Sequence, residues 1–232
     1  MKAILLAAGY GTRLMPITKN TPKCMVKVNG IPLISYWLEL LKGQEIDHIL
    51  INTHYLANIV EDYCMNSLFS KKIVLSYEEE LLGTGGTIFA NKDFFDDAPF
   101  LIAHADNLTN FDLRAFINAH RERPEGAEMT MMTFNTDDPQ SCGILELNSS
   151  GVVIKMHEKI KKPRGCLANA AVYIVERSVL DFIVEIGKKK LDFSTEVIPK
   201  FINKIYTFHN TIYHRDIGTI ESLNKANEEY LF

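Results

Sequence analysis

The first 25 residues constrain the fold more than any other stretch of the sequence. Residues 2–8 (KAILLAA) form a short apolar run, long enough for a buried strand and too short to cross a membrane. The run leads directly into a glycine-rich segment, residues 9–14 (GYGTRL). A buried strand followed by such a turn places backbone N–H groups at the carboxyl end of a sheet, where open α/β folds bind ligands. This stretch therefore predicts an α/β fold that holds a phosphate-bearing ligand, which we interpret as a nucleoside triphosphate.

Composition limits the partners and compartments that the chain suits. The chain has 232 residues, 47% of them hydrophobic, enough for one large domain or two small ones. The net charge of -4 gives no argument for a nucleic-acid surface, and no apolar run is long enough to cross a membrane. The four cysteines show no CxxC pair, and no signal-peptide cleavage site follows the first apolar run. We therefore expect a cytoplasmic protein that binds neither nucleic acid nor membranes.

Strand and helix patterns alternate along the first half of the chain. This alternation favours a parallel sheet with right-handed crossovers. From residue 127 onward, strand patterns follow one another with turn signals between them. We predict strands over 2–8, 48–52, 72–77, 99–104, 128–134, 143–147, 152–157 and 168–175, and helices over 32–42, 56–69, 87–94, 113–123, 178–187, 197–203 and 220–230.

Six short motifs, in order along the chain, resemble the signature of the sugar-phosphate nucleotidyltransferases (NDP-sugar pyrophosphorylases). They are residues 6–14 (LAAGYGTRL) with Pro22 and Lys23, 82–86 (LGTGG), 104–106 (HAD), 142–144 (CGI), 158–159 (EK) and 216–219 (DIGT). The first motif alone is weak, but six in order over nearly the whole chain are specific. The resemblance implies a Rossmann-like, mixed, mainly parallel sheet flanked by helices, in a GT-A-like nucleotidyltransferase fold. We expect one domain, residues 1–232, with a nucleotide-binding half over 1–126 and a sugar-phosphate-binding half over 127–232.

The resemblance also implies a reaction. An oxygen of a sugar-1-phosphate attacks the α-phosphorus of an NTP, and pyrophosphate leaves. A phosphate monoester has a second pKa of about 6 and needs no general base, so catalysis reduces to positioning and charge neutralisation. Arg13 and Lys23 are the expected catalytic cations, and Asp106 and Asp216 are the expected ligands of Mg²⁺. We expect nucleotide binding by Leu6, Ala7, Ala8, Gly9, Gly11, Thr12, Glu78, Gly83 and Thr84, and sugar-phosphate binding by Asn107, Gly143, Glu158, Lys159 and Asn169.

Glu78 bears on the choice of nucleotide. In the family, a residue five places before the loop glycine often contacts the base, and Glu78 stands there before Gly83. A carboxylate accepts hydrogen bonds and guanine offers two donors, whereas a glutamine would suit uracil or thymine better. GTP is therefore favoured. Residues 82–86 (LGTGG) also resemble the corresponding segment of guanylyltransferases, which implies mannose- or heptose-1-phosphate as the sugar substrate. A uridylyl-, cytidylyl- or thymidylyltransferase for another sugar-1-phosphate is the alternative, and Lys161 or Lys162 is an alternative to Lys159.

Other classes of nucleotide-binding protein fit the first motif less well. A Rossmann dehydrogenase needs GxGxxG after the strand and a Walker-A NTPase needs Gly-Lys-Ser/Thr, and residues 9–14 supply neither. A non-catalytic nucleotide-sugar sensor has no need of two metal carboxylates. Taken singly, Arg13 could be a solvated surface residue, Asp106 a helix N-cap and Asp216 a turn former. The oligomeric state is left open, with a homo-oligomer among the options.

Overall fold

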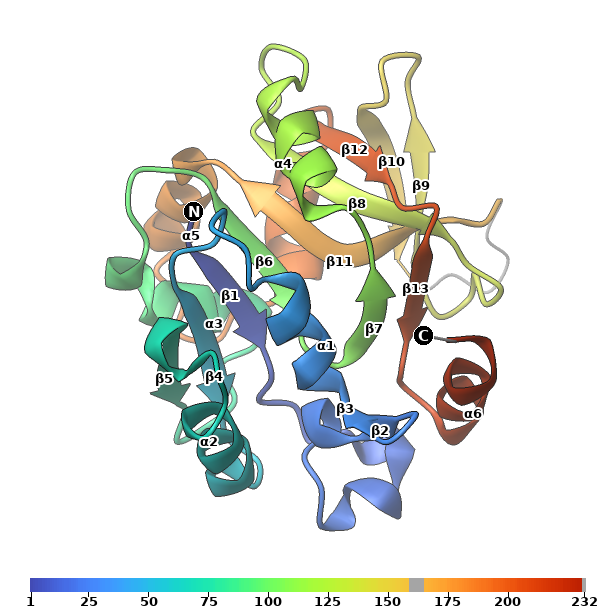
Figure 1. Ribbon diagram of the computed structural model, residues 1–232. Helices are drawn as coiled ribbons and strands as arrows, with labels where there is room; N and C mark the ends of the chain where they lie inside the picture. Colours follow the sequence, from blue (N-terminus) through green and yellow to red (C-terminus); the bar gives the residue numbers. More distant parts are fainter. Residues whose placement is uncertain (159–164, 231–232) are drawn as a thin grey trace. The chain divides into compact units, whose positions relative to one another are not determined.

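A computed structural model of the protein describes residues 1–158 and 165–230, and tertiary contacts divide the chain into two compact units (Figure 1). Unit 1 is assembled from three separate segments and unit 2 from two. The expected functional halves, residues 1–126 and 127–232, follow other boundaries and stay a prediction. Unit 1 comprises Met1–Leu81, Ala103–Asn110 and Tyr213–Phe232, and unit 2 comprises Leu82–Ile102 and Phe111–Ile212.

Unit 1 is built on a parallel sheet in the strand order β1–β4–β5. Every residue of β1 and β4 is buried, which is typical of parallel strands covered on both faces. Helix α2 packs against β4 and β5, and α1 buries Trp37 within the same unit. The elements of unit 1 are β1 (Ala3–Leu6), β2 (Lys27–Val28), β3 (Ile31–Pro32), α1 (Leu33–Leu40), β4 (Ile49–Thr53), α2 (Ala57–Met65), β5 (Ile73–Tyr77), β7 (Asn107–Asn110), β13 (Tyr213–Asp216) and α6 (Ile220–Glu229).

Unit 2 contains a mixed sheet in the order β10–β9–β11–β8–β12, in which β12 alone runs parallel to its neighbour. Helix α4 packs against β8 and β12, and α3 packs against α5. Strand β6 (Phe100–His104) begins in this unit and ends in unit 1. The other elements of unit 2 are α3 (Thr84–Ala90), α4 (Leu113–Arg121), β8 (Met129–Asn135), β9 (Gly143–Leu147), β10 (Val153–Glu158), β11 (Leu167–Val175), α5 (Arg177–Ile186) and β12 (Ile205–His209).

The predicted fold class, a mixed sheet of parallel and antiparallel strands flanked by helices, is confirmed. The helix predicted over residues 197–203 is wrong. A π-helical turn over Phe193–Val197 and a 3-10 turn over Ile198–Lys200 take its place. The Asp192 side chain accepts from the Thr195 N–H at 2.8 Å and starts the turn earlier, while Pro199 lacks the N–H that would continue a regular helix.

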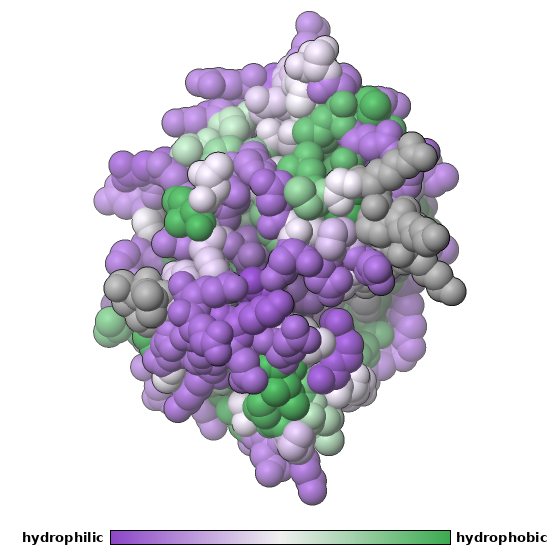
Figure 2. All heavy atoms as spheres, turned by 90° about the vertical axis from the view of Figure 1, so that its right-hand side faces the viewer, coloured by the Kyte–Doolittle hydropathy of each residue, from purple (hydrophilic) through white to green (hydrophobic). Residues whose placement is uncertain are grey.

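None of the helices within residues 1–158 and 165–230 is both long and apolar enough to cross a bilayer. Figure 2 shows one face of the molecule, on which hydrophilic residues predominate and hydrophobic residues gather in small patches.

His120 is a buried histidine of α4 whose ring is held within unit 2. Its Nδ1 lies 2.8 Å from the Thr130 hydroxyl and its Nε2 lies 3.2 Å from a carboxylate oxygen of Glu176. Arg123 donates to the same carboxylate oxygen, so that negative charge is already compensated. Burial, and then the positive charge of Arg123, lower the pKa of His120 to about 3. The ring is therefore neutral in the folded chain near pH 7.

We expect acid to destabilise the chain through His120. Because the folded pKa lies below the ordinary value of 6.5, its contribution to stability is complete above pH 6.5 and is lost as the pH falls toward 3. Between about pH 7.5 and 5.5, the wild type should lose about 1.4 kcal/mol more free energy of unfolding than His120→Gln. Urea titrations at both pH values measure this difference. The exposed His48, changed to Gln, is the matched control and should behave like the wild type; equal losses in wild type and His120→Gln would contradict the prediction.

Candidate active site

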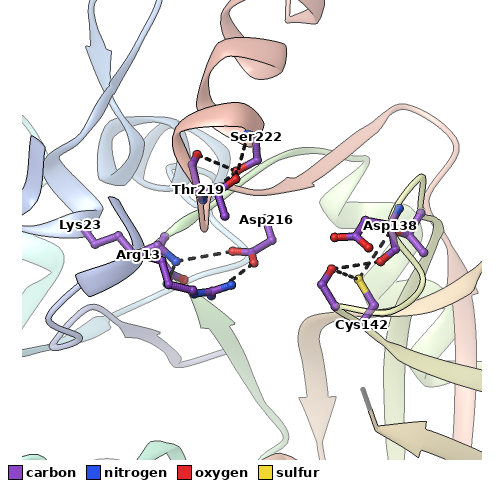
Figure 3. Close-up of polar contacts among 10 residues, drawn as sticks. Arg13, Lys23, Asp138, Cys142, Asp216, Thr219 and Ser222 are labelled. Carbon is purple, nitrogen blue, oxygen red and sulfur yellow. Dashed lines mark hydrogen bonds and ion pairs between the residues drawn. The ribbon is translucent and has the colours of Figure 1, made fainter. Parts of the chain in front are cut away.

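Four residues predicted to act on phosphates or metal meet in unit 1. The Lys23 ammonium donates to Asp106 Oδ2 at 2.5 Å and to Asp216 Oδ1 at 3.5 Å. Arg13 Nη2 lies 3.9 Å from the other Asp216 oxygen. In Figure 3 the side chains of Arg13 and Lys23 both approach the Asp216 carboxylate. The structure thus brings together two cations and two carboxylates that lie far apart in the sequence.

A short antiparallel ladder brings the two aspartates together. Strand β7 begins at Asn107, directly after Asp106, and β13 ends at Asp216. Asn107 and Asp216 face one another in the register of this ladder. Asn107 is itself buried, and its carbonyl accepts from the Trp37 indole N–H at 2.9 Å, which ties β7 to α1. The backbone, rather than long flexible side chains, therefore sets the distance between the carboxylates.

An apolar cluster anchors each segment that carries a site residue. Its buried members include a close sequence neighbour of Arg13, of Lys23, of Asp106 and of Asp216. Helix α6 follows the last of these segments and begins with a reciprocal cap between Thr219 and Ser222 (Figure 3). Since core residues occupy well-defined positions, they hold the polar neighbours in place. The cluster comprises Leu14, Val26, Val28, Leu33, Leu108, Ile217, Leu223 and Ala226.

Charge and burial act against one another at Lys23 and Asp106. Burial lowers the pKa of Lys23, but the negative charges of Asp106 and Asp216 outweigh it, and the net pKa is raised. Burial raises the pKa of Asp106, and the positive charges of Lys23 and His104 outweigh it, so the net pKa is lowered. The side chain of Lys23 is only 10% exposed, whereas that of Arg13 is 62% exposed. Lys23 is therefore a buried member of the site that forms an ion pair with its carboxylates. The guanidinium of Arg13 is exposed, so a ligand can reach it.

The glycine-rich turn follows β1 as predicted. Leu6, Ala7 and Ala8 are buried, and Gly9 is exposed. Gly11 has a φ of 64°, and a Cβ there would lie 3.0 Å from the side chains of both Lys23 and Thr18. Among the described residues, none accepts a hydrogen bond from the N–H groups of residues 9–12, which include Thr12. These N–H groups can therefore donate hydrogen bonds to a ligand, as a phosphate-binding turn requires.

Gly218 belongs to the same site, although no role was predicted for it from the sequence. A Cβ at this position would lie 2.8 Å from Asp216 Oδ2 and 3.0 Å from Arg13 Nη2. The absence of a side chain leaves room for the approach of Arg13 to Asp216. Its position in the motif of residues 216–219 was the available signal.

The expected Mg²⁺ suits the two carboxylates. Within residues 1–158 and 165–230, no group of three or more His, Cys, Asp or Glu side chains is arranged to hold a metal ion. Mg²⁺ commonly binds through one or two carboxylates together with substrate phosphates and water. One oxygen each of Asp106 and Asp216 already converges on the Lys23 ammonium. This hard-oxygen donor pair fits Mg²⁺ when the phosphates of a nucleotide complete the ligand set.

Glu78 lies directly after β5 and is 4% exposed. Its Oε1 accepts from Asn52 Nδ2 at 2.8 Å, and Asn52 Oδ1 accepts from the Ala7 N–H at 2.7 Å. His54 Nδ1 lies 2.8 Å from the Glu78 carbonyl oxygen, and the Tyr10 hydroxyl lies 2.9 Å from His54 Nε2. Neither Asn52 nor His54 was predicted from the sequence. A polar residue directly after a buried apolar run, as Asn52 is after residues 49–51 in β4, was the signal for the first of them.

The second glycine cluster has a structural role in unit 2. The N–H groups of Gly85 and Gly86 both donate to the Leu191 carbonyl, at 2.9 and 3.0 Å. A Cβ at Gly83, whose φ is 76°, would lie 2.7 Å from the same oxygen. Thr84 Oγ1 accepts from the Phe193 N–H at 2.8 Å. Close packing on residues 189–193 therefore accounts for these glycines, and nucleotide binding by Gly83 and Thr84 stays a prediction.

The described sugar-side residues also lie in unit 2. Gly143 and Glu158 face one another across β9 and β10, and a Cβ at Gly143 would lie 2.7 Å from Glu158 Oε2. Asn169 stands where the register of β11 shifts, and it donates to the Tyr173 hydroxyl at 2.8 Å. Their roles in sugar binding stay predictions. Lys159, Lys161 and Lys162 lie outside the described residues.

A cavity of about 670 Å³ lies in unit 1 beside α1 and α2. Its lining includes Met25, Tyr63 and Phe69, and none of the predicted site residues contributes to it. We therefore assign the candidate active site to the strand ends, where the cations and carboxylates converge.

Comparisons with known proteins identify relatives of this chain. The profile of the nucleotidyl transferase family matches residues 2–231. Mannose-1-phosphate guanylyltransferase of Mycobacterium tuberculosis is 28% identical over 232 residues, covering 98% of this chain and 64% of that protein. UTP–glucose-1-phosphate uridylyltransferase of Synechocystis is 29% identical over 223 residues, covering 90% of this chain and 57% of that protein. The chain thus spans about three fifths of the length of these curated relatives.

A solved structure gives the same fold. The crystal structure of HddC from Yersinia pseudotuberculosis superposes with a TM-score of 0.83 at 26% sequence identity, covering 99% of each chain.

The turn of residues 9–12 allows a matched test of backbone strain. Gly11→Ala should lower the free energy of unfolding by about 1–2 kcal/mol, because an L-residue is strained in the left-handed region. Gly9→Ala is the control, since its φ is not positive and a methyl group added there would have no heavy atom within 4 Å. Urea denaturation measures both variants. A loss for Gly9→Ala as large as that for Gly11→Ala would contradict the prediction.

Proposed function

The chain belongs to the nucleotidyl transferase family, and we propose that it transfers a nucleotidyl group from an NTP to a sugar-1-phosphate, releasing an NDP-sugar and pyrophosphate. One observation carries the proposal: Lys23 lies between Asp106 and Asp216, beside Arg13. Such a set of charges suits a reaction in which two polyanions must approach one another.

The chemistry needs positioning more than proton transfer. An oxygen of the sugar phosphate forms a bond to the α-phosphorus, and the bond from that phosphorus to the bridging oxygen of pyrophosphate breaks. The attacking phosphate is already largely dianionic near pH 7, its second pKa being about 6. The protein must therefore align the reactants and neutralise charge on the transferring group and on the leaving group.

Each site residue has a separate role in the proposal. The N–H groups of residues 9–12 cradle the triphosphate, and Arg13 binds the leaving pyrophosphate through its forked guanidinium. Lys23 stabilises the α-phosphate. Asp106 and Asp216 would hold Mg²⁺, which when bound neutralises phosphate charge.

GTP with mannose- or heptose-1-phosphate is the substrate pair that we favour. The acceptor character of Glu78 suits the donors on the guanine edge. The similarity to a mannose-1-phosphate guanylyltransferase supports the same choice. The similarity to a UTP–glucose-1-phosphate uridylyltransferase supports the second candidate, transfer from UTP to another sugar-1-phosphate.

Pyrophosphate release with each of the four NTPs tests the proposed reaction. The purified chain is mixed with mannose-, heptose-, glucose- and N-acetylated sugar-1-phosphates in the presence of Mg²⁺. We expect release with GTP and mannose- or heptose-1-phosphate, its loss with EDTA, and its return with excess Mg²⁺. Silence across the whole panel would reject the enzyme and favour a non-catalytic nucleotide-sugar-binding regulator, whereas turnover with UTP alone would select the second candidate.

Replacing one carboxylate tests the proposed metal site. Asp106→Asn should lower kcat on the order of 100-fold or more, because it removes a preorganised charge from the reacting phosphates. The exposed Asp93, changed to Asn, is the control for the same chemical change outside the proposed site. Rates are measured at saturating Mg²⁺ and substrate, and circular dichroism checks the fold. Undiminished turnover of Asp106→Asn would remove this residue from the metal site.

A further inference from the structure

We infer that Asn52 is a positioning residue that fixes the hydrogen-bonding character of Glu78 and thereby sets which base the site prefers. The inference deepens the proposed function and rests on it, because it takes Glu78 to face the base. It concerns a residue that touches neither phosphate nor metal in the proposal. Its basis is a chain of hydrogen bonds that runs from the residue after β1 through β4 to the residue after β5.

The orientation of the Asn52 amide is determined by the backbone. An Asn side chain has one accepting and one donating end. The Ala7 N–H can only donate, and it lies 2.7 Å from the Asn52 side-chain oxygen. The oxygen must therefore face Ala7, and the NH₂ group must face Glu78, whose Oε1 lies 2.8 Å away. Asn52 is 3% exposed, so water does not offer an easy alternative to either contact.

Glu78 is fixed at its backbone as well as at its side chain. Its N–H donates to the Thr53 carbonyl at 2.8 Å, and its carbonyl oxygen lies 2.8 Å from His54 Nδ1. His54 in turn contacts the hydroxyl of Tyr10 in the glycine-rich turn. The residue therefore has little freedom to turn its carboxylate or to shift along the strand end.

The direction of the Asn52 hydrogen bond determines whether residue 78 can offer the base a hydrogen-bond donor or an acceptor. Asn52 offers a donor, so the atom of residue 78 that faces it must be an acceptor. A carboxylate meets this demand and presents acceptors on both oxygens. A glutamine at the same position would meet it with its only oxygen, and its NH₂ would then be the remaining polar end. The same relay thus favours a donor-rich base with Glu78 and an acceptor-rich base with Glu78→Gln.

Exchanging the amide of residue 52 with the carboxylate of residue 78 tests the direction of the hydrogen bonds while side-chain size and net charge stay the same. In the double variant Asn52→Asp/Glu78→Gln, the new carboxylate accepts from Ala7 and from the new amide NH₂. The amide oxygen then becomes the remaining polar end, as in the wild type. Shape and net charge equal those of the wild type, and only the order of the two groups along the relay is reversed.

The test compares the kcat/KM ratio for GTP over UTP in the wild type, Glu78→Gln and the double variant. Glu78→Gln should lower this ratio on the order of 10-fold or more, because a hydrogen-bond donor replaces an acceptor. The double variant should return the ratio to within about threefold of the wild type. Asn52→Asp alone sets two carboxylates against one another, and it should weaken binding of both nucleotides.

Equilibrium binding of GTP and UTP without sugar phosphate gives the ratio of the two binding constants, a second measure of base preference that does not depend on turnover. A double variant that keeps the ratio of Glu78→Gln, in turnover and in binding, would overturn the role of Asn52. Equal ratios in all the variants would do the same. The proposed function fails separately, on absence of pyrophosphate release by the wild type, and thermal unfolding of each variant excludes a general loss of fold.

Discussion

The site depends on one ammonium group that compensates two carboxylates from distant parts of the chain. Asp106 and Asp216 would repel one another if Lys23 were absent, and a partly buried charge without a partner is costly. Lys23 is 193 positions from Asp216 in the sequence, so this contact holds the first and last segments of unit 1 together. The same charges that stabilise the arrangement are those that a polyphosphate and Mg²⁺ would meet. The ion pairs that stabilise this part of the fold are therefore formed by the same groups that would bind the substrates.

The backbone around this ion pair is specified by apolar packing. Each charged residue lies close in sequence to a buried residue of the cluster that joins the N-terminal turn, β7 and α6. The charged groups would contribute the proposed chemistry, and their apolar neighbours determine where those groups lie. Arg13 is the most exposed of the four charged residues, with 62% of its side chain accessible, although the adjacent Leu14 is buried.

Local patterns predicted most elements and pointed to Arg13 and Lys23, whereas Asp106 and Asp216 were identified through the resemblance to a family. Buried strands such as β1, which is wholly apolar, and β4, which begins with three apolar residues, are visible directly in the sequence. Strand β7, with the sequence NLTN, has no such pattern and was missed; it pairs with β13 across 104 positions, a distance that local periodicity does not sense. Asn52 was missed for a related reason, since its side-chain partners, Ala7 and Glu78, lie just after two other strands and far from it in the sequence. The glycines of residues 83–86 carried a strong pattern, yet their close contact with Leu191 could not be read from their own segment.

The pairing of β7 with β13 also determines when, during synthesis of the chain, the candidate site can form. The glycine-rich turn, Arg13, Lys23 and Asp106 leave the ribosome well before β13, and at about 5–20 residues per second the interval is on the order of 5–20 s. Until β13 pairs, Lys23 has one carboxylate partner and Arg13 lacks its own. A nascent chain can thus contain the whole glycine-rich turn and still lack the second carboxylate. The four charged groups of the candidate site are complete only when translation has reached the last segment of unit 1.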